Sequence, residues 1–128
     1  MTEQQTDLSD LITRVCGQLK IDTEFVHQKA SILSATSSTS THEEFAGLAT
    51  ACADLVQRAQ AAGYELTSAG IEDWVYSVKA CHEVAFRAHD AMGKAEAASR
   101  SDSDTEIHGY LESAENELSY AVSSINGA

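Results

Sequence analysis

The chain has 128 residues, of which 43% are hydrophobic, and its 20 acidic and 8 basic side chains give a formal net charge of −12 at pH 7. This length and composition suit one globular domain that can bury its own hydrophobic core. The acidic balance excludes nucleic acid and anionic membrane surfaces as expected partners, because both carry negative charge.

Three features of the sequence bear on its compartment. Residues 1–7 contain no basic cluster followed by an apolar run, which a signal peptide would need. No stretch approaches the roughly 20 apolar residues of a membrane span. The three cysteines, Cys16, Cys52 and Cys81, are an odd number without a CxxC pair, which argues against a disulfide framework. We therefore expect a cytoplasmic protein, with secretion by a route that needs no cleaved signal left open.

The first segment predicts a helix in two pieces, residues 7–20 and 22–35. Apolar residues recur at steps of three and four, and the chain has no proline to interrupt a helix. Asp22 stands where the apolar stripe should continue, so we interpret it as an N-cap with Ile21 and Val26 as a hydrophobic staple. The first helix is therefore expected to be broken or kinked near Asp22.

The other three helices are predicted at 42–62, 68–98 and 104–126. Thr41 to Glu44 and Ser103 to Glu106 both have the capping-box pattern, in which a hydroxyl residue is followed three positions later by Glu. Gly63 suits the left-handed position that ends a helix, and Thr67 or Ser68 can cap the next one. The second and fourth apolar stripes consist of Phe45, Leu48, Cys52, Leu55, Ala59 and Ala62, and of Ile107, Leu111, Ala114, Leu118, Ala121 and Ile125.

The predicted linkers are short and polar, at residues 36–41, 63–67 and 99–104. Short connections favour antiparallel neighbours. The fold class is therefore all-α, an antiparallel up-down-up-down four-helix bundle, in one domain that spans residues 1–128.

The third helix carries two histidines on its predicted apolar stripe. The steps of four and three give Ile71, Val75, Val78, His82, Ala85, His89 and Met92. This register turns His82 and His89 toward the core, where each needs a hydrogen-bonding partner. We expect both to be structural residues.

A metal site is the first alternative for these histidines. Counting outward from the predicted turns places His42 level with His89, and one of Glu43, Glu115 or His108 would complete a Zn or Fe site at the end of the bundle. Di-iron bundles need Glu-x-x-His on two helices, whereas the run from Glu24 to His27 is the sole instance here. We expect neither metal nor cofactor, and His42 and His89 are the candidates if a metal is present.

The stretch from Ala88 to Lys94 resembles a fragment of the histidine phosphotransfer motif. In that family a histidine on a helix is followed at the fourth position by glycine, whose missing side chain lets a response regulator approach; His89 and Gly93 match this pattern. Ala91 and Met92 stand where the family has Leu and Lys. The resemblance implies a phosphoacceptor at His89, which would have to face solvent, whereas the predicted register turns it inward.

No catalytic machinery is visible in the sequence. The three cysteines lie on or beside apolar stripes, where thiols are usually inert, and no phosphate-binding loop, nucleophile elbow or His-Glu-x-x-His helix is present. We predict that the protein is not an enzyme.

The fourth helix and the linker before it concentrate negative charge. No Lys or Arg occurs between Ser101 and Ala128, and the predicted docking residues are Asp102, Asp104, Glu106, Glu112, Glu115 and Glu117. An unbalanced acidic surface on a small bundle is typical of proteins that meet a basic cleft. We expect a protein that binds another protein with a basic surface, of the inhibitor, immunity or adaptor type.

Two questions stay open at this point. The alternative function is a small carrier or sensor that uses His89 as a metal ligand or phosphoacceptor, and self-association into a homodimer is not decided by the pattern.

Trp74, Phe86 and Tyr110 flank the apolar stripes. We expect these aromatic residues to widen the core, the alternative being that they anchor a partner.

Overall fold

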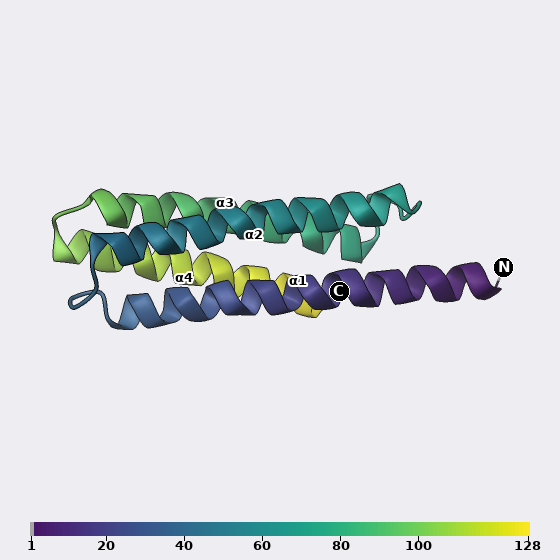
Figure 1. Cartoon of the computed structure of the whole chain (residues 1–128), viewed down its shortest axis with the longest axis horizontal. Helices are drawn as coiled ribbons and strands as arrows, with labels where there is room; N and C mark the ends of the chain where they lie inside the picture. Colours follow the sequence, from purple (N-terminus) through teal and green to yellow (C-terminus); the bar gives the residue numbers. More distant parts are fainter. Residues whose placement is uncertain (1) are drawn as a thin grey trace.

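The computed structural model describes residues 2–128, with side chains from residue 8 onward. The chain forms four helices, α1 (Thr2–Ala35), α2 (His42–Ser68), α3 (Tyr76–Arg100) and α4 (Asp104–Asn126), which lie side by side (Figure 1). Within these described residues there is no strand and no helix long and apolar enough to cross a membrane. The predicted all-α four-helix bundle is confirmed, and the bounds predicted for the last helix are those observed.

Contacts between the helices show that connected helices run in opposite directions (Figure 1). Arg14 near the start of α1 pairs with Glu65 near the end of α2, with Nη2 2.7 Å from Oε2. The ring Nε2 of His42, at the start of α2, lies 2.8 Å from the carbonyl oxygen of Ser101, just after α3. These contacts place the ends of α1 and α3 at the same end of the bundle as the starts of α2 and α4.

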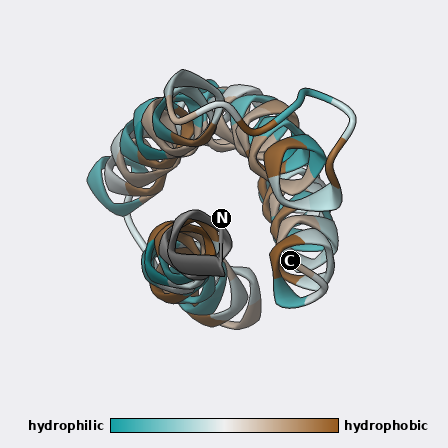
Figure 2. Ribbon diagram, turned by 90° about the vertical axis from the view of Figure 1, so that its right-hand side faces the viewer, coloured by the Kyte–Doolittle hydropathy of each residue, from teal (hydrophilic) through white to brown (hydrophobic). Residues whose placement is uncertain are grey.

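The core lies along the common axis of the four helices, seen end-on in Figure 2. Every apolar residue predicted for the second and fourth helices is buried. Thr41 forms the predicted capping box with Glu44 at the start of α2. Ser103 caps α4 by accepting a hydrogen bond from the Glu106 amide, and Ser101 Oγ, rather than a carboxylate, accepts the Ser103 amide proton. The second capping box is therefore only half formed.

The prediction of two helical pieces in the first segment is wrong, because α1 is one uninterrupted helix. Thr23 takes the core position between Leu19 and Val26, and its hydroxyl donates to the Leu19 carbonyl oxygen at 2.6 Å. That hydrogen bond removes the cost of burying a hydroxyl. Asp22 is therefore free to face α2 instead of capping a helix.

The predicted turn at residues 63–67 is also misplaced. Gly63 lies inside α2 and is buried against Cys81, whereas Gly70 has the positive φ of 97° that suits glycine. The Gly70 amide donates to the Thr67 carbonyl and the Ile71 amide donates to the Leu66 carbonyl, which is the Schellman pattern. The turn therefore spans residues 69–75, and the third helix starts at Tyr76 instead of residue 68.

The register predicted for the third helix is wrong by about one residue. His82 and His89 are exposed, and Ala85 and Met92 are only half-buried. The buried face of α3 keeps Val78 but otherwise lies one position earlier, and it consists mainly of small side chains, namely Cys81, Val84, Ala88, Ala91, Ala95 and Ala98. Because alanine lets helices approach closely, this stripe packs at the axis and leaves both histidines outside.

Candidate functional site

The predicted acidic docking residues fall into two groups. Asp102, Asp104 and Glu106 are exposed at the end of the bundle, while Glu117 is half-buried beside α3. Glu117 Oε2 lies 3.1 Å from Nη1 of Arg87. The last segment of the sequence has no basic residue, but Arg87 on α3 neutralises Glu117.

The remaining predicted acids, Glu112 and Glu115, lie between Glu106 and Glu117 on α4. Glu112 is exposed, and its Oε2 lies 3.4 Å from His108 Nε2. Glu115 is half-buried. Neither residue is placed against a lysine or arginine by an ion pair in the described part of the chain.

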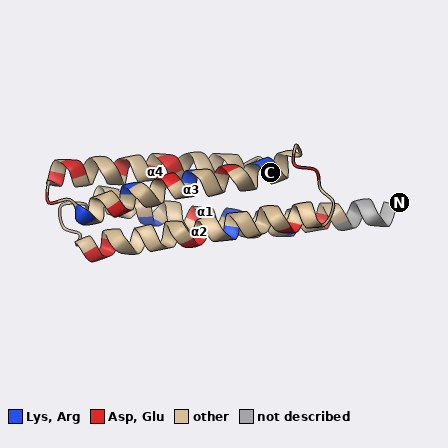
Figure 3. Ribbon diagram, turned by 90° about the horizontal axis from the view of Figure 1, so that it is seen from above, with Lys and Arg blue, Asp and Glu red and all other residues tan. Residues whose placement is uncertain are grey.

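The bundle end gains two further carboxylates that the sequence pattern did not connect with α4. The contact between His42 and Ser101 brings the start of α2 beside the linker before α4. Both helix starts carry acidic residues, visible as red segments at the same end in Figure 3. The resulting set, which we call the acidic end, consists of the exposed residues Glu43, Glu44, Asp102, Asp104 and Glu106. None of these five forms an ion pair among the side chains that the structure describes, and the positive helix N-termini partly offset their charge.

The structure does not bring together the residues of the alternative metal site. His42 is tied to Ser101, and His89 is an exposed residue in the middle of α3. Across the described residues, no three His, Cys, Asp or Glu side chains are grouped so that they could hold a metal ion. His108 instead lies 3.3 Å from the Ser37 hydroxyl, where it joins the end of α1 to the start of α4.

A cluster around Arg87 joins α3 and α4 at the surface. Its Nε lies 2.8 Å from Glu83 Oε1, and its Nη1 reaches Glu117 across the α3–α4 seam. The guanidinium carbon lies 4.9 Å from the ring centroid of Tyr120 and 5.8 Å from that of Phe86. We call these five residues the Arg87 cluster. The hydrogen bonds to Glu117 and then Glu83 raise the pKa of Arg87, so the guanidinium stays charged.

The two rings of the Arg87 cluster face solvent. Phe86 is 61% exposed and Tyr120 is 57% exposed, so the expectation that Phe86 widens the core is wrong. Trp74 is likewise exposed, in the turn before α3, and only Tyr110 packs against the core. A half-buried arginine that is held by two carboxylates and contacts two exposed aromatic rings has the composition of an interface hot spot.

The sequence pattern indicated Phe86 but not Tyr120. Tyr120 is two positions past the buried Leu118, which turns it away from the core, and nothing in the sequence relates it to a residue on α3. The available signal was the acid-first spacing of Glu83 and Arg87, which fixes the guanidinium along α3 but does not identify the ring that packs on it.

His89 lies next to the Arg87 cluster on the outside of α3. It follows Phe86 by one turn, and Gly93 follows it by another. A Cβ atom built at Gly93 would meet no neighbouring heavy atom within 4 Å. The imidazole and the backbone after it are therefore both accessible to another macromolecule.

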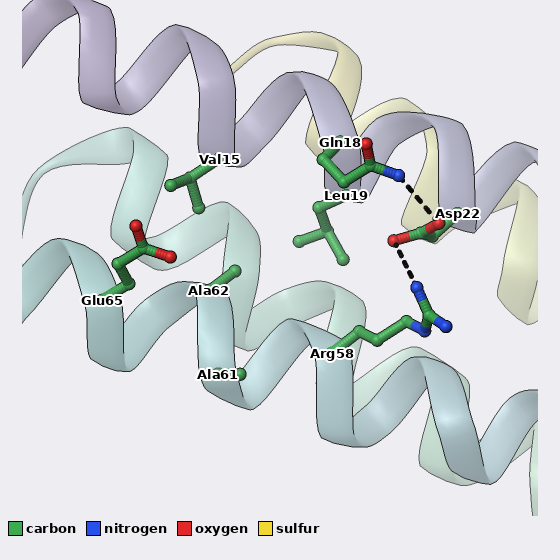
Figure 4. Close-up of a pocket in the computed structure, with 8 residues that line it drawn as sticks. All are labelled: Val15, Gln18, Leu19, Asp22, Arg58, Ala61, Ala62 and Glu65. Carbon is green, nitrogen blue, oxygen red and sulfur yellow. Dashed lines mark hydrogen bonds and ion pairs between the residues drawn. The ribbon is translucent and has the colours of Figure 1, made fainter.

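The seam between α1 and α2 contains a hollow whose charged groups satisfy one another (Figure 4). Asp22 accepts hydrogen bonds from Gln18 Nε2 at 3.2 Å and from Arg58 Nη1 at 3.4 Å. Arg58 Nε also donates to Asp54 at 2.7 Å. This hollow thus contains a structural bridge between α1 and α2.

The surface therefore presents two features without a role in the bundle's own core, the acidic end and the Arg87 cluster with its neighbour His89. The first gathers charge and the second gathers exposed aromatic rings. Comparisons with protein-family models, with curated proteins and with solved structures found no match to the chain.

Proposed function

We propose that the protein is a non-enzymatic, cytoplasmic binding protein of the inhibitor, immunity or adaptor type, and that it docks another protein on its α3–α4 face. The observation that supports this proposal is the Arg87 cluster, in which two exposed rings flank a guanidinium that two carboxylates hold in place. Binding to a surface that is already ordered loses less side-chain entropy than binding to mobile residues.

The acidic residues of α4 and its linker contribute attraction over longer distances. Asp102, Asp104, Glu106 and Glu112 are exposed, and the chain as a whole carries a charge of −12. A partner with a basic surface is therefore attracted before contact and oriented toward α4. This contribution weakens as salt shortens the Debye length from roughly 30 Å at 0.01 M to roughly 8 Å at physiological ionic strength.

The first experiment compares the two exposed rings of the Arg87 cluster with an exposed ring elsewhere on the surface. The wild-type chain and the Phe86→Ala/Tyr120→Ala variant are each used to capture proteins from the native host, and the captured proteins are quantified by mass spectrometry. The matched control is Tyr64→Ala, since Tyr64 is 75% exposed on α2. We expect at least one protein to be lost with the double variant and kept with the control. Equal capture by all three chains would contradict the proposed docking face.

The second experiment separates the long-range electrostatic attraction of the partner from its direct contact with the docking face. With the captured partner purified, Asp102→Asn/Glu112→Gln is expected to lower the association rate and flatten its salt dependence, while dissociation stays nearly unchanged. The double ring variant should instead speed dissociation. An association rate that does not respond to salt in the wild-type chain would show that the acidic residues do not steer the partner.

Phosphotransfer through His89 is a second candidate function on the same face. The observation that favours it is the exposure of His89 together with the open backbone at Gly93, which removes the inward orientation expected from the sequence. In such a step the Nε2 or Nδ1 atom forms a bond to the phosphorus of a donor phosphohistidine or phosphoaspartate, and the donor's P–N or P–O bond breaks.

This candidate predicts an acid-labile phosphoryl group on His89. The chain is purified from its native cells at alkaline pH, and its peptides are mapped by mass spectrometry. His89→Gln should remove the modification, whereas His82→Gln, at another exposed histidine of α3, should leave it. A chain labelled by phosphoramidate serves as the reference for detection, and an unmodified His89 in the native sample would count against phosphotransfer.

A further inference from the structure

The outer face of α1 carries an apolar stripe that the bundle does not cover. Ile21, Phe25 and Ile32 are 61%, 58% and 62% exposed, although the opposite face of the same helix lies in the core. Gln28 is also exposed and fills the remaining position of the stripe. A helix with apolar residues on two faces has a surface suited to a second packing partner.

The spacing of this stripe is the same in both directions along the helix. Positions 21, 25, 28 and 32 are separated by four, three and four residues. An antiparallel copy of α1 therefore places Ile21 opposite Ile32 and Phe25 opposite Gln28, and then repeats both contacts across the axis. A twofold interface requires this kind of self-complementary pattern.

A hollow beside the stripe provides room for the side chains of a second copy. It has a volume of about 330 Å³, and Ile32 and Leu33 line it from α1 while Gly47 and Leu48 line it from α2. A Cβ atom built at Gly47 would meet nothing within 4 Å, so the backbone there is open. The partner Ile21, which lies opposite Ile32 in the antiparallel arrangement, would pack at this hollow.

Charge also favours a second copy at this face over the other faces of the protein. Two chains of charge −12 repel one another through most of their surface. Residues 14–35 of α1, however, carry three basic and two acidic side chains, and none of the four stripe positions is charged. Lys29, which lies over the Phe25 ring at 5.2 Å, and Glu44 lie beside the hollow with opposite charges.

From these observations we infer that the protein forms a twofold homodimer in which the α1 helices of two copies pack antiparallel along Ile21, Phe25, Gln28 and Ile32. This interface lies apart from the α3–α4 docking face, so each dimer presents two copies of the Arg87 cluster. The dimer is held by apolar contact and is therefore expected to persist at high salt.

The first test is the molar mass of the full chain over a range of concentrations, measured by light scattering after gel filtration and by sedimentation velocity. We expect the mass to approach twice the chain mass of 13.7 kDa as concentration rises. Phe25→Ser should shift the chain to monomer, while Phe86→Ser, at an equally exposed phenylalanine on α3, should leave the dimer intact. A monomer at every concentration, or a dimer lost with Phe86→Ser but not with Phe25→Ser, would overturn the inference.

A charge exchange tests the antiparallel orientation. Ile21→Glu and Ile32→Lys should each weaken the dimer, because each places an unpaired charge in an apolar contact. The double variant should recover the dimer, because each new Glu then faces the new Lys of the second copy. If the double variant stays as monomeric as the single variants while its circular dichroism shows the native helices, the antiparallel pairing is wrong.

Discussion

Individual thiols in the core are shielded from solvent by burial. Cys52 is fully buried, and desolvation raises the pKa of its thiol to about 12. Cys16 on α1 and Cys81 on α3 are also buried, and their interaction across the core lowers the pKa of Cys16 and raises that of Cys81. The Cys52 thiol of the folded chain therefore stays neutral at alkaline pH values at which the thiol of the unfolded chain ionises.

This burial predicts an alkaline loss of stability. The folded pKa of Cys52 lies above its ordinary value of 9.0, so its contribution is fully present below pH 9 and is lost as pH rises toward about 12. Between these values the unfolded chain has released a proton that the folded chain retains, at a cost of up to about 1.4 kcal/mol per pH unit. Urea unfolding at several pH values should show a shallower decline for Cys52→Ala than for the wild-type chain, and parallel declines would contradict this role.

The ends of the helices depend on which glycine adopts a left-handed conformation. Gly70 has φ of 97° and ends α2, whereas Gly63 lies within the helix. A Cβ atom at Gly63 would lie 3.6 Å from the Cys81 Cβ, which is an ordinary contact. The two positions therefore respond in opposite directions to the same substitution.

Gly63→Ala is expected to stabilise the protein and Gly70→Ala to destabilise it. Alanine at position 63 removes the helix-interior penalty of glycine, a gain of about 0.5–1 kcal/mol. Alanine at position 70 must adopt a positive φ, at a cost of about 1–2 kcal/mol. Denaturant unfolding measures both changes. Destabilisation by Gly63→Ala together with no effect of Gly70→Ala would place the turn where the sequence predicted it.

The core of the whole molecule is built from helices that contribute side chains of unequal size. α3 contributes mainly alanine, so the largest buried side chains come from α2 and α4, among them Phe45, Leu55, Leu111 and Leu118. Close packing of small against large residues leaves little freedom to absorb a charged side chain. The cooperativity of the bundle therefore depends on a few large residues on α2 and α4.

Leu118→Asp should abolish cooperative folding. Leu118 has no exposed surface, and an unpaired carboxylate there costs several kcal/mol against a typical total stability of about 5–15 kcal/mol. Ser119→Asp is the matched control, because Ser119 is the adjacent residue and is exposed. Circular dichroism during urea unfolding should show a sharp transition for the control and a lost or greatly shifted one for Leu118→Asp. Equal transitions would mean that α4 does not pack as described.

The sequence alone determined the four-helix architecture, both bounds of α4 and the buried faces of α2 and α4. These features rest on local signals, because capping residues fix a helix start and leucine or isoleucine every three or four residues defines one apolar face. The sequence also placed Phe86 beside the apolar stripe of its helix and Glu117 among the acidic residues of the last helix. It did not identify their common partner, since Arg87 and Tyr120 meet only when α3 and α4 pack.

Tertiary structure decided the orientation of α3, and with it the candidate site. Ala88 and Ala95 follow Cys81 at intervals of seven residues, and each lies one residue before His89 or Glu96. Two stripes of similar spacing therefore compete for the buried face of α3. Alanine buries little surface, and its periodicity is therefore a weak signal in the sequence. Close approach to the neighbouring helices favours the alanine stripe in the folded bundle, which leaves His89 and the rings of the Arg87 cluster at the surface.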